Sequence, residues 1–349
     1  MINNYVNLLG LFIIFITKSF YYMAMPIIVL EFPSIYFILI SMTLHSLLNY
    51  AVCLSYMKNF SQTNNFEINN LRTNNLETNN NFVNNKILIL ISGTCHALSN
   101  IFYLYTVAVT RTPIILQSNA LLLGMSLTMI LRNFFTGKKI QNFIYFTFGI
   151  VLIIISCCFC IIPYTSNINK LYWAMSFMVY IILSSLSVIT QELYLEKQSL
   201  YLLNNVRLQL YNHVIQIIII VCFCWIDKFI GFSNDSFELS INNFLSSIKH
   251  VFEDPIIYIF VLVIVYIQLT WIFIESFINE FITNYVEYYL PIINGLIYQF
   301  PLIFYIWFDD MYFPNNFKII IVIVVVMNVY ASIFFRKSIV KKIEKYELV

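Results

Sequence analysis

The chain carries ten long apolar runs, and these constrain its fold more than any other feature. Each is long enough to cross the ~30 Å hydrocarbon core of a bilayer as a helix rising ~1.5 Å per residue. The runs lie at about residues 5–25, 33–56, 86–109, 113–131, 140–163, 171–192, 204–226, 255–275, 281–307 and 318–335. With 60% hydrophobic and 10% charged residues, the chain exposes too much apolar surface for a soluble domain. The sequence predicts an all-α polytopic membrane protein embedded in the lipid bilayer, with the first run retained as a span.

The basic residues between the runs predict the orientation, because Lys and Arg favour cytosolic loops. If both termini are cytosolic, the inner loops and the tail hold twelve Lys and Arg residues and the outer loops hold five. An even number of spans fits this arrangement. We therefore expect N- and C-termini in the cytosol and a cytosolic tail at 341–349.

Two loops differ from the rest. Within 59–85 an Asn pair recurs every five residues from Asn64 to Asn79, and such a composition cannot build a packed core. We expect this segment to be a disordered cytosolic insertion. Residues 227–254 form an outer loop of mixed polarity that is long enough for a short surface helix. All seven cysteines fall inside apolar runs, which favours packing thiols over disulfides or a metal site.

The segment TRTPIILQSNALLLGM, from Thr110 to Met125, is interrupted by a proline at membrane depth. A helix that begins on a proline there leaves backbone groups free, and other helices or a water-filled cavity must satisfy them. A second Pro-Ile-Ile triplet, at Pro291, lies 178 positions after the one at Pro113. Two interrupted segments at matching places in two halves are typical of repeat-built secondary transporters. We therefore expect a substrate cavity lined by the adjacent polar residues Gln117, Ser118 and Asn119.

Short motifs along the chain resemble, in the same order, those of the chloroquine-resistance transporter family of the drug/metabolite transporter superfamily. They are Ile16-Thr17-Lys18, Thr110-Arg111-Thr112 with Gln117-Ser118, Leu131-Arg132, Thr190-Gln191-Glu192, Arg207-Leu208 with Gln216, and Ser332-Ile333-Phe334-Phe335-Arg336. The resemblance extends over about residues 8–340. The chain also departs from the family, because Gln191 stands where the family has an arginine. The outer loop lacks the cysteines of the family's malaria-parasite members.

The resemblance implies ten transmembrane helices arranged as two inverted five-helix repeats, 1–165 and 166–340, around a central cavity. It also implies a secondary active transporter that exports small organic solutes (amino acids, short peptides, thiols or cationic amphiphiles) from an acidic endolysosomal or vacuolar compartment. Such export is linked to protons, and a plastid envelope is the alternative membrane. The last four residues, Tyr346–Val349, fit a Tyr-x-x-apolar sorting pattern and agree with an endolysosomal membrane. We expect a monomer with no cofactor and no nucleic-acid partner.

Two ionisable residues inside the spans are candidates for the substrate cavity. Lys18 lies deep in the first run, where an uncompensated lysine costs about 2.5–3.5 kcal/mol on insertion scales. It either extends to an interface or faces the cavity, and the family resemblance favours the cavity. Histidine titrates near neutrality, so His45 in the second run suits a carrier that faces an acidic lumen. We expect His45 to serve both the cavity and proton coupling.

Other polar residues of the spans allow two interpretations each. Glu192 ends the sixth run as either an interfacial carboxylate or a coupling group, and Arg207 can pair with Glu192 or Glu196. We assign Glu192 and Arg207 to coupling or gating. His96 fits a hydrogen-bonded core histidine better than a functional one. His213 could face the cavity, but the phase of its helix does not follow from the sequence.

Other classes of protein fit less well. The chain contains no catalytic motif such as H-E-x-x-H or G-x-S-x-G, so we expect it not to be an enzyme. It has no filter-like repeated segment of the kind a channel needs. A nucleotide-sugar or phosphate-ester carrier needs cationic groups in its cavity, and the spans offer only Lys18 and the terminal Arg111 and Arg207. A membrane scaffold that transports nothing is the remaining alternative.

Overall fold

The structure is a computed structural model that describes residues 2–32, 34–63, 79–108, 110–137, 140–165, 167–196, 201–223, 237–281, 283–308 and 318–339. Over these residues the protein is all-helical, with no strand. The helices before and after the predicted Asn-rich insertion extend into it, because one ends at Thr63 and the next begins at Asn79. The middle of that insertion and the tail at 341–349, with its sorting pattern, lie outside the described residues.

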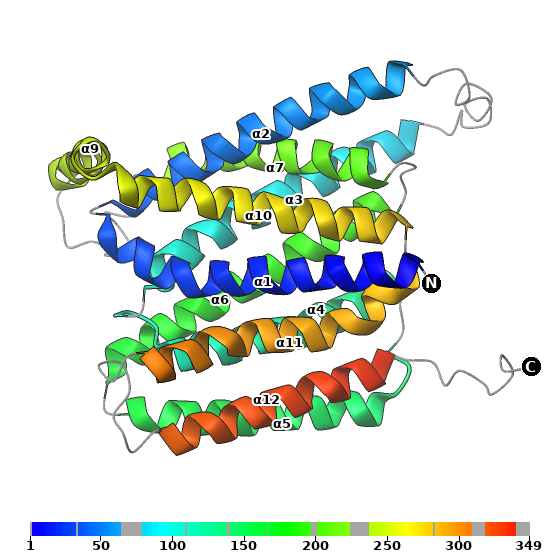
Figure 1. The fold of residues 1–349 in the computed structure, drawn as a ribbon, viewed down its shortest axis with the longest axis vertical. Helices are drawn as coiled ribbons and strands as arrows, with labels where there is room; N and C mark the ends of the chain where they lie inside the picture. Colours follow the sequence, from blue (N-terminus) through cyan, green and yellow to red (C-terminus); the bar gives the residue numbers. More distant parts are fainter. Residues whose placement is uncertain are drawn as a thin grey trace, which may run out of the picture.

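Every predicted apolar run forms a helix. The helices are α1 (Ile2–Glu31), α2 (Ile35–Thr63), α3 (Asn79–Thr106), α4 (Ile114–Phe135), α5 (Phe143–Ile161), α6 (Ile168–Leu195), α7 (Tyr201–Phe223), α9 (Phe237–Glu253), α10 (Pro255–Phe281), α11 (Thr283–Phe308) and α12 (Lys318–Ile339). A short 3-10 turn, Ile162–Tyr164, follows α5. The expected surface helix in the outer loop is α9, which packs against α2 and α10 and lies across the bundle. In Figure 1, α1 begins and α12 ends at the same end of the bundle.

The long helices fit a multi-pass membrane protein. Among the described residues, nine helices are long and apolar enough to cross a bilayer, and α11 adds a shorter apolar stretch, Pro291–Phe304. Large apolar side chains cover the outside of the bundle, such as Phe148, Val221 and Ile319, each more than half exposed. A surface of this kind is costly in water and favourable against lipid tails.

In Figure 1, α2, α3, α7 and α10 lie on one side of α1 and α4, α5, α11 and α12 form a second group on the other, while α6 crosses behind α1. The largest apolar core lies among α1, α2, α3, α6, α7 and α10 and includes two residues of α4, Ala120 and Leu121. A second core joins α4, α5 and α12, and α11 packs against α4 and α12. Small residues bring helices together in this second group: a Cβ on Gly295 of α11 would overlap the Ser332 hydroxyl of α12. Close backbone approach at small residues is a usual way for membrane helices to associate.

Candidate functional site

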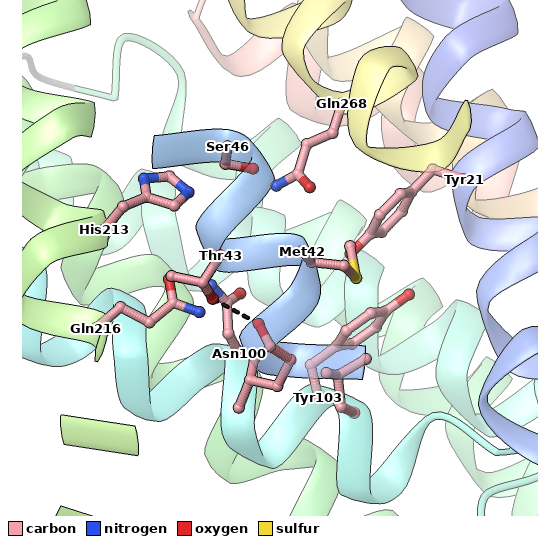
Figure 2. Close-up of a pocket in the computed structure, with 11 residues that line it drawn as sticks. Tyr21, Met42, Thr43, Ser46, Asn100, Tyr103, His213, Gln216 and Gln268 are labelled. Carbon is pink, nitrogen blue, oxygen red and sulfur yellow. Dashed lines mark hydrogen bonds between the residues drawn. The ribbon is translucent and has the colours of Figure 1, made fainter. Parts of the chain in front are cut away.

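A small cavity lies among α1, α2, α3, α7 and α10 (Figure 2). Its polar lining residues are Thr43, Ser46, Asn100, His213, Gln216 and Gln268. Its aromatic and aliphatic lining residues are Tyr21, Leu39, Met42, Tyr103 and Leu104. The cavity volume is ≈ 20 Å³, which is room for about one water molecule. The helices leave no room there for an organic solute, and we call this conformation closed.

A stripe of polar residues on α7 faces the inside of the bundle. The amides Asn205, Gln209, Asn212 and Gln216 recur at helical spacing, and each is at most 8% exposed. Apolar residues of the same helix, such as Val214, point outward. Polar groups in membrane helices are placed inside a bundle because lipid cannot satisfy their hydrogen bonds. The α7 sequence therefore places a polar stripe inside the bundle, and its residue Gln216, with the nearby His213, forms the α7 wall of the cavity.

Hydrogen bonds on this wall join α3 to α7. The Asn100 amide nitrogen donates to Gln216 Oε1 at 3.3 Å and lies 3.1 Å from His96 Nε2. His213 Nδ1 lies 2.7 Å from the Gln209 carbonyl oxygen. A carbonyl only accepts, so Nδ1 carries the proton and Nε2 is the acceptor of the neutral ring. The wall thus presents amide donors and an imidazole acceptor.

The ring of Tyr50 and a second imidazole, His96, pack against the ring of His213. The His96 and His213 ring centroids are 5.4 Å apart, and the Tyr50 ring centroid is 5.3 Å from that of His213. Tyr50 in turn packs against Phe273 of α10. The sequence interpretation of His96 as a hydrogen-bonded core residue agrees with its contact to Asn100, but its position beside His213 was not foreseen.

Beyond the cavity, toward the end of the bundle where α1 begins, lies an ion pair between α1 and α10. Lys18 Nζ is 3.0 Å from Glu275 Oε2, and the two side chains are 14% and 27% exposed. Lys18 Nζ also lies 5.8 Å from the centroid of the Trp271 ring. That ring meets Tyr21, a cavity residue, edge to face at 5.1 Å. Lys18 is therefore about one helical turn from the cavity and is neutralised by a carboxylate that the sequence analysis did not consider.

The three polar residues of the α4 segment bond within the protein. Gln117 Nε2 donates to the carbonyls of Val107 and Thr112, both at 2.7 Å, and so satisfies the backbone freed at the α3–α4 break. The Ser118 hydroxyl donates to the Tyr298 carbonyl at 2.6 Å. The cavity between α1, α2, α3, α7 and α10 is not lined by Gln117, Ser118 or Asn119. Their assignment to a substrate cavity stays a prediction.

Asn119 belongs to a separate polar cluster in the second helix group. Its Oδ1 accepts from Ser156 Oγ at 3.0 Å and from the amide of Asn328. The Asn328 amide also donates to Gln299 Oε1 at 3.1 Å. The cluster joins α4, α5, α11 and α12 through buried amides and a hydroxyl, which gives it a part in holding these helices together.

The proposed coupling residues His45, Glu192 and Arg207 each contact a different neighbour. His45 Nδ1 is 2.8 Å from the Ser41 carbonyl of its own helix, and its ring lies beside Tyr258 of α10. Glu192 pairs with Arg132 of α4, whose Nε donates to Glu192 Oε2 at 2.8 Å. Arg207 Nη1 lies 3.5 Å from Asn204 Oδ1. None of these contacts joins the three residues to one another, and their role in coupling stays a prediction.

Several cavity residues were missed in the sequence analysis. Asn100 and Gln268 are single amides in apolar runs, so no sequence pattern marks them. On α7, amides recur at helical spacing, and this signal could have identified Gln216 as a lining residue. Among the described residues, no group of three or more His, Cys, Asp or Glu is placed to hold a metal ion.

Comparisons of the chain with models of known protein families, with curated proteins and with solved structures find no match.

Proposed function

We propose that the chain is a secondary active transporter for small organic solutes, and that the cavity among α1, α2, α3, α7 and α10 is its solute site. The observation that supports this most is the cavity lining, where the amides of Asn100, Gln216 and Gln268 and the imidazole of His213 converge inside a bundle of long apolar helices. Polar groups in that position are costly and mark solute or ion pathways in membrane proteins. The short motifs shared with the chloroquine-resistance transporter family support the same proposal.

Helix packing supports two inverted repeats. Let α1 to α5 correspond in order to α6, α7, α10, α11 and α12. Under this correspondence, each contact between two helices should have a matching contact between their counterparts. The contact of α1 with α10 is matched by that of α6 with α3, and the contact of α4 with α6 by that of α11 with α1. The contact of α3 with α7 is matched by that of α10 with α2. Three further contacts join a helix directly to its own counterpart in the other repeat: α2 with α7, α4 with α11, and α5 with α12. A repeat of five helices ends on the opposite side of the membrane from where it began, so the second copy is inverted.

Repeats of this kind give a mechanism for transport. The cavity lies where helices of both proposed repeats meet, because α1, α2 and α3 come from one and α7 and α10 from the other. Movement of one repeat against the other would open the cavity to each side in turn. We infer that both termini are cytosolic, from the distribution of basic residues, and that the membrane is endolysosomal or vacuolar, from the family resemblance and the Tyr346–Val349 pattern.

Uptake by the purified chain in liposomes tests the proposal. The solutes are amino acids, short peptides, glutathione, a cationic quinoline and the uncharged 2-phenylacetamide, each with and without an inward-acid pH gradient. We expect saturable uptake of at least one class, increased by the gradient. The control is a Gln216→Leu/Gln268→Leu variant, which replaces two lining amides with apolar side chains and should lose uptake. No uptake of any class above protein-free liposomes would instead favour a scaffold.

The nucleotide-sugar or phosphate-ester alternative is disfavoured by the same cavity. A phosphate group needs Lys or Arg within reach, and no described lining residue carries a positive charge. Lys18, the nearest lysine on α1, is already paired with Glu275.

A further inference from the structure

The cavity lining carries no formal charge. Its described polar residues are amides, hydroxyls and an imidazole, and none of the described lining residues is Asp, Glu, Lys or Arg. Lys18, about one helical turn from the lining residue Tyr21 along α1, is paired with Glu275 of α10. A charged solute transferred into such a site would lose its hydration and find no opposite charge.

The polar side of the cavity has hydrogen-bonding groups left for a ligand. The Gln268 carboxamide makes no hydrogen bond within the described part of the chain, and Figure 2 shows it pointing from α10 toward the α2 side of the cavity. It supplies two donors and an acceptor. His213 adds an acceptor, because its Nδ1 hydrogen is held by the Gln209 carbonyl. A ligand amide would complement both residues.

The opposite side of the cavity is apolar and aromatic. The Tyr21 and Tyr103 rings stack with centroids 5.9 Å apart and planes inclined by 12°, and Met42 lies between α2 and these rings in Figure 2. Flat rings and a flexible thioether are favourable contacts for an aromatic or aliphatic group. The two sides together match a solute with one uncharged polar end and one apolar end.

We infer that the cavity selects uncharged solutes in which an amide or hydroxyl group adjoins an aromatic or aliphatic group, with Gln268 and His213 as the residues that contact the polar end. This inference rests on the proposed function, because it names the substrate class of that same site. Cations are the charged solutes most able to compete for this cavity, because aromatic faces also attract them. The test must therefore compare charges at constant shape.

Binding of four phenyl compounds to the full-length protein in nanodiscs at pH 7 makes this comparison. The compounds are 2-phenylacetamide (neutral), 2-phenylethylamine (cation), phenylacetate (anion) and L-phenylalanine (zwitterion). We expect saturable binding of the amide, with the cation and the anion weaker by on the order of a hundredfold, as the cost of an uncompensated charge at membrane depth implies. Equal or tighter binding of any charged compound would overturn the inference.

Substitutions of Gln268 test whether the selection comes from the cavity. Gln268→Glu places a carboxylate there, and the preference should move from the amide to 2-phenylethylamine. Gln268→Leu should weaken the amide without strengthening the cation. Asn167→Asp adds the same charge at the start of α6, outside the cavity, and should leave the preference unchanged. If Gln268→Glu is not monodisperse, Gln268→Leu decides, because unchanged amide binding in that variant also overturns the inference.

Uptake separates this inference from the proposed function. If a charged solute of the liposome panel is transported while 2-phenylacetamide is neither bound nor transported, the carrier proposal stands and the uncharged class is wrong. If 2-phenylacetamide binds saturably but no compound is ever transported, the site is correct and the carrier proposal fails.

Discussion

At the scale of single residues, this protein uses two different ways to keep polar groups inside a membrane bundle. Lys18 and Glu275 neutralise each other across α1 and α10, although they are 257 positions apart in the sequence. Amides such as Gln117 instead bond the backbone. Removing one partner of a buried pair leaves the other without compensation, which costs more than the pair contributes.

The ion pair predicts unequal effects of single and double substitutions. Lys18→Thr leaves the Glu275 carboxylate alone between two helices, so the folded state should lose about 2–4 kcal/mol and Tm should fall. Lys18→Thr/Glu275→Gln removes both charges and should recover most of that loss. Thermal unfolding in detergent measures both. A double variant as unstable as the single one would mean that Lys18 acts through packing alone.

The same variants bear on selectivity. Lys18→Thr leaves a net negative charge one turn from the cavity, so uptake of a dicationic amphiphile should rise relative to a neutral solute. In the double variant this ratio should return to that of the unmodified chain. The ratio of the two uptake rates in liposomes is the measurement, and equal ratios in all three proteins would remove Lys18 from selectivity.

We expect the pH dependence of transport to come from histidine residues. The sequence assigned coupling to His45, but His213 lines the cavity. Among the described residues, the titratable side chains Tyr50 and His96 pack against the His213 ring. A charge that appears in one orientation of a carrier shifts the equilibrium between its two orientations only if the charged group makes different contacts in each. We therefore expect His213→Gln to flatten the pH profile of uptake more than His45→Asn does. A flat profile in His45→Asn alone, with normal expression, would restore the sequence assignment.

At the scale of helices, the sequence predicted the elements well because bilayer thickness fixes their length. Each of the ten apolar runs overlaps most of a helix, and α9 appears in the predicted outer loop. The ends were less accurate, since α2 continues to Thr63 and α3 begins at Asn79 within the polar Asn-rich stretch. Polar residues next to a span can extend its helix into water, where hydropathy gives no signal.

The α3–α4 break predicts a structural effect for Gln117. Gln117→Leu removes two hydrogen bonds and leaves the Val107 and Thr112 carbonyls without that donor, which should cost about 1–3 kcal/mol. Because Gln117 does not line the described cavity, relative uptake of different solutes should not change. A changed solute preference at unchanged Tm would support the direct substrate contact that the sequence predicted.

The close approach of α11 and α12 makes Gly295 sensitive to size. Gly295→Leu forces a side chain against Ser332 and should destabilise the protein by about 3 kcal/mol or more, as overpacking of tight sites does. Its neighbour Leu296 is 41% exposed, so Leu296→Ala should have little effect and serves as the control. Thermal unfolding compares the two, and a Gly295→Leu variant with unchanged Tm would contradict the packing of these helices.

At the scale of the whole molecule, the site was harder to predict than the fold. A cavity depends on which faces of α1, α2, α3, α7 and α10 meet, and hydropathy does not give the rotation of a helix that is apolar on most sides. The α7 amides recur at helical spacing and could have indicated one wall. Nothing in the sequence links them to Gln268 or Tyr21, which lie far away along the chain.

The central claim is that this cavity opens to each side of the membrane in turn. It is tested by Ser46→Cys, introduced on a background in which the seven native cysteines are replaced, with a membrane-impermeant thiol reagent applied to either side of proteoliposomes. Because Ser46 is 4% exposed in the closed conformation, modification requires opening. The account predicts modification from both sides, slowed from both by a bound solute. Modification from one side only, or from neither, would contradict it.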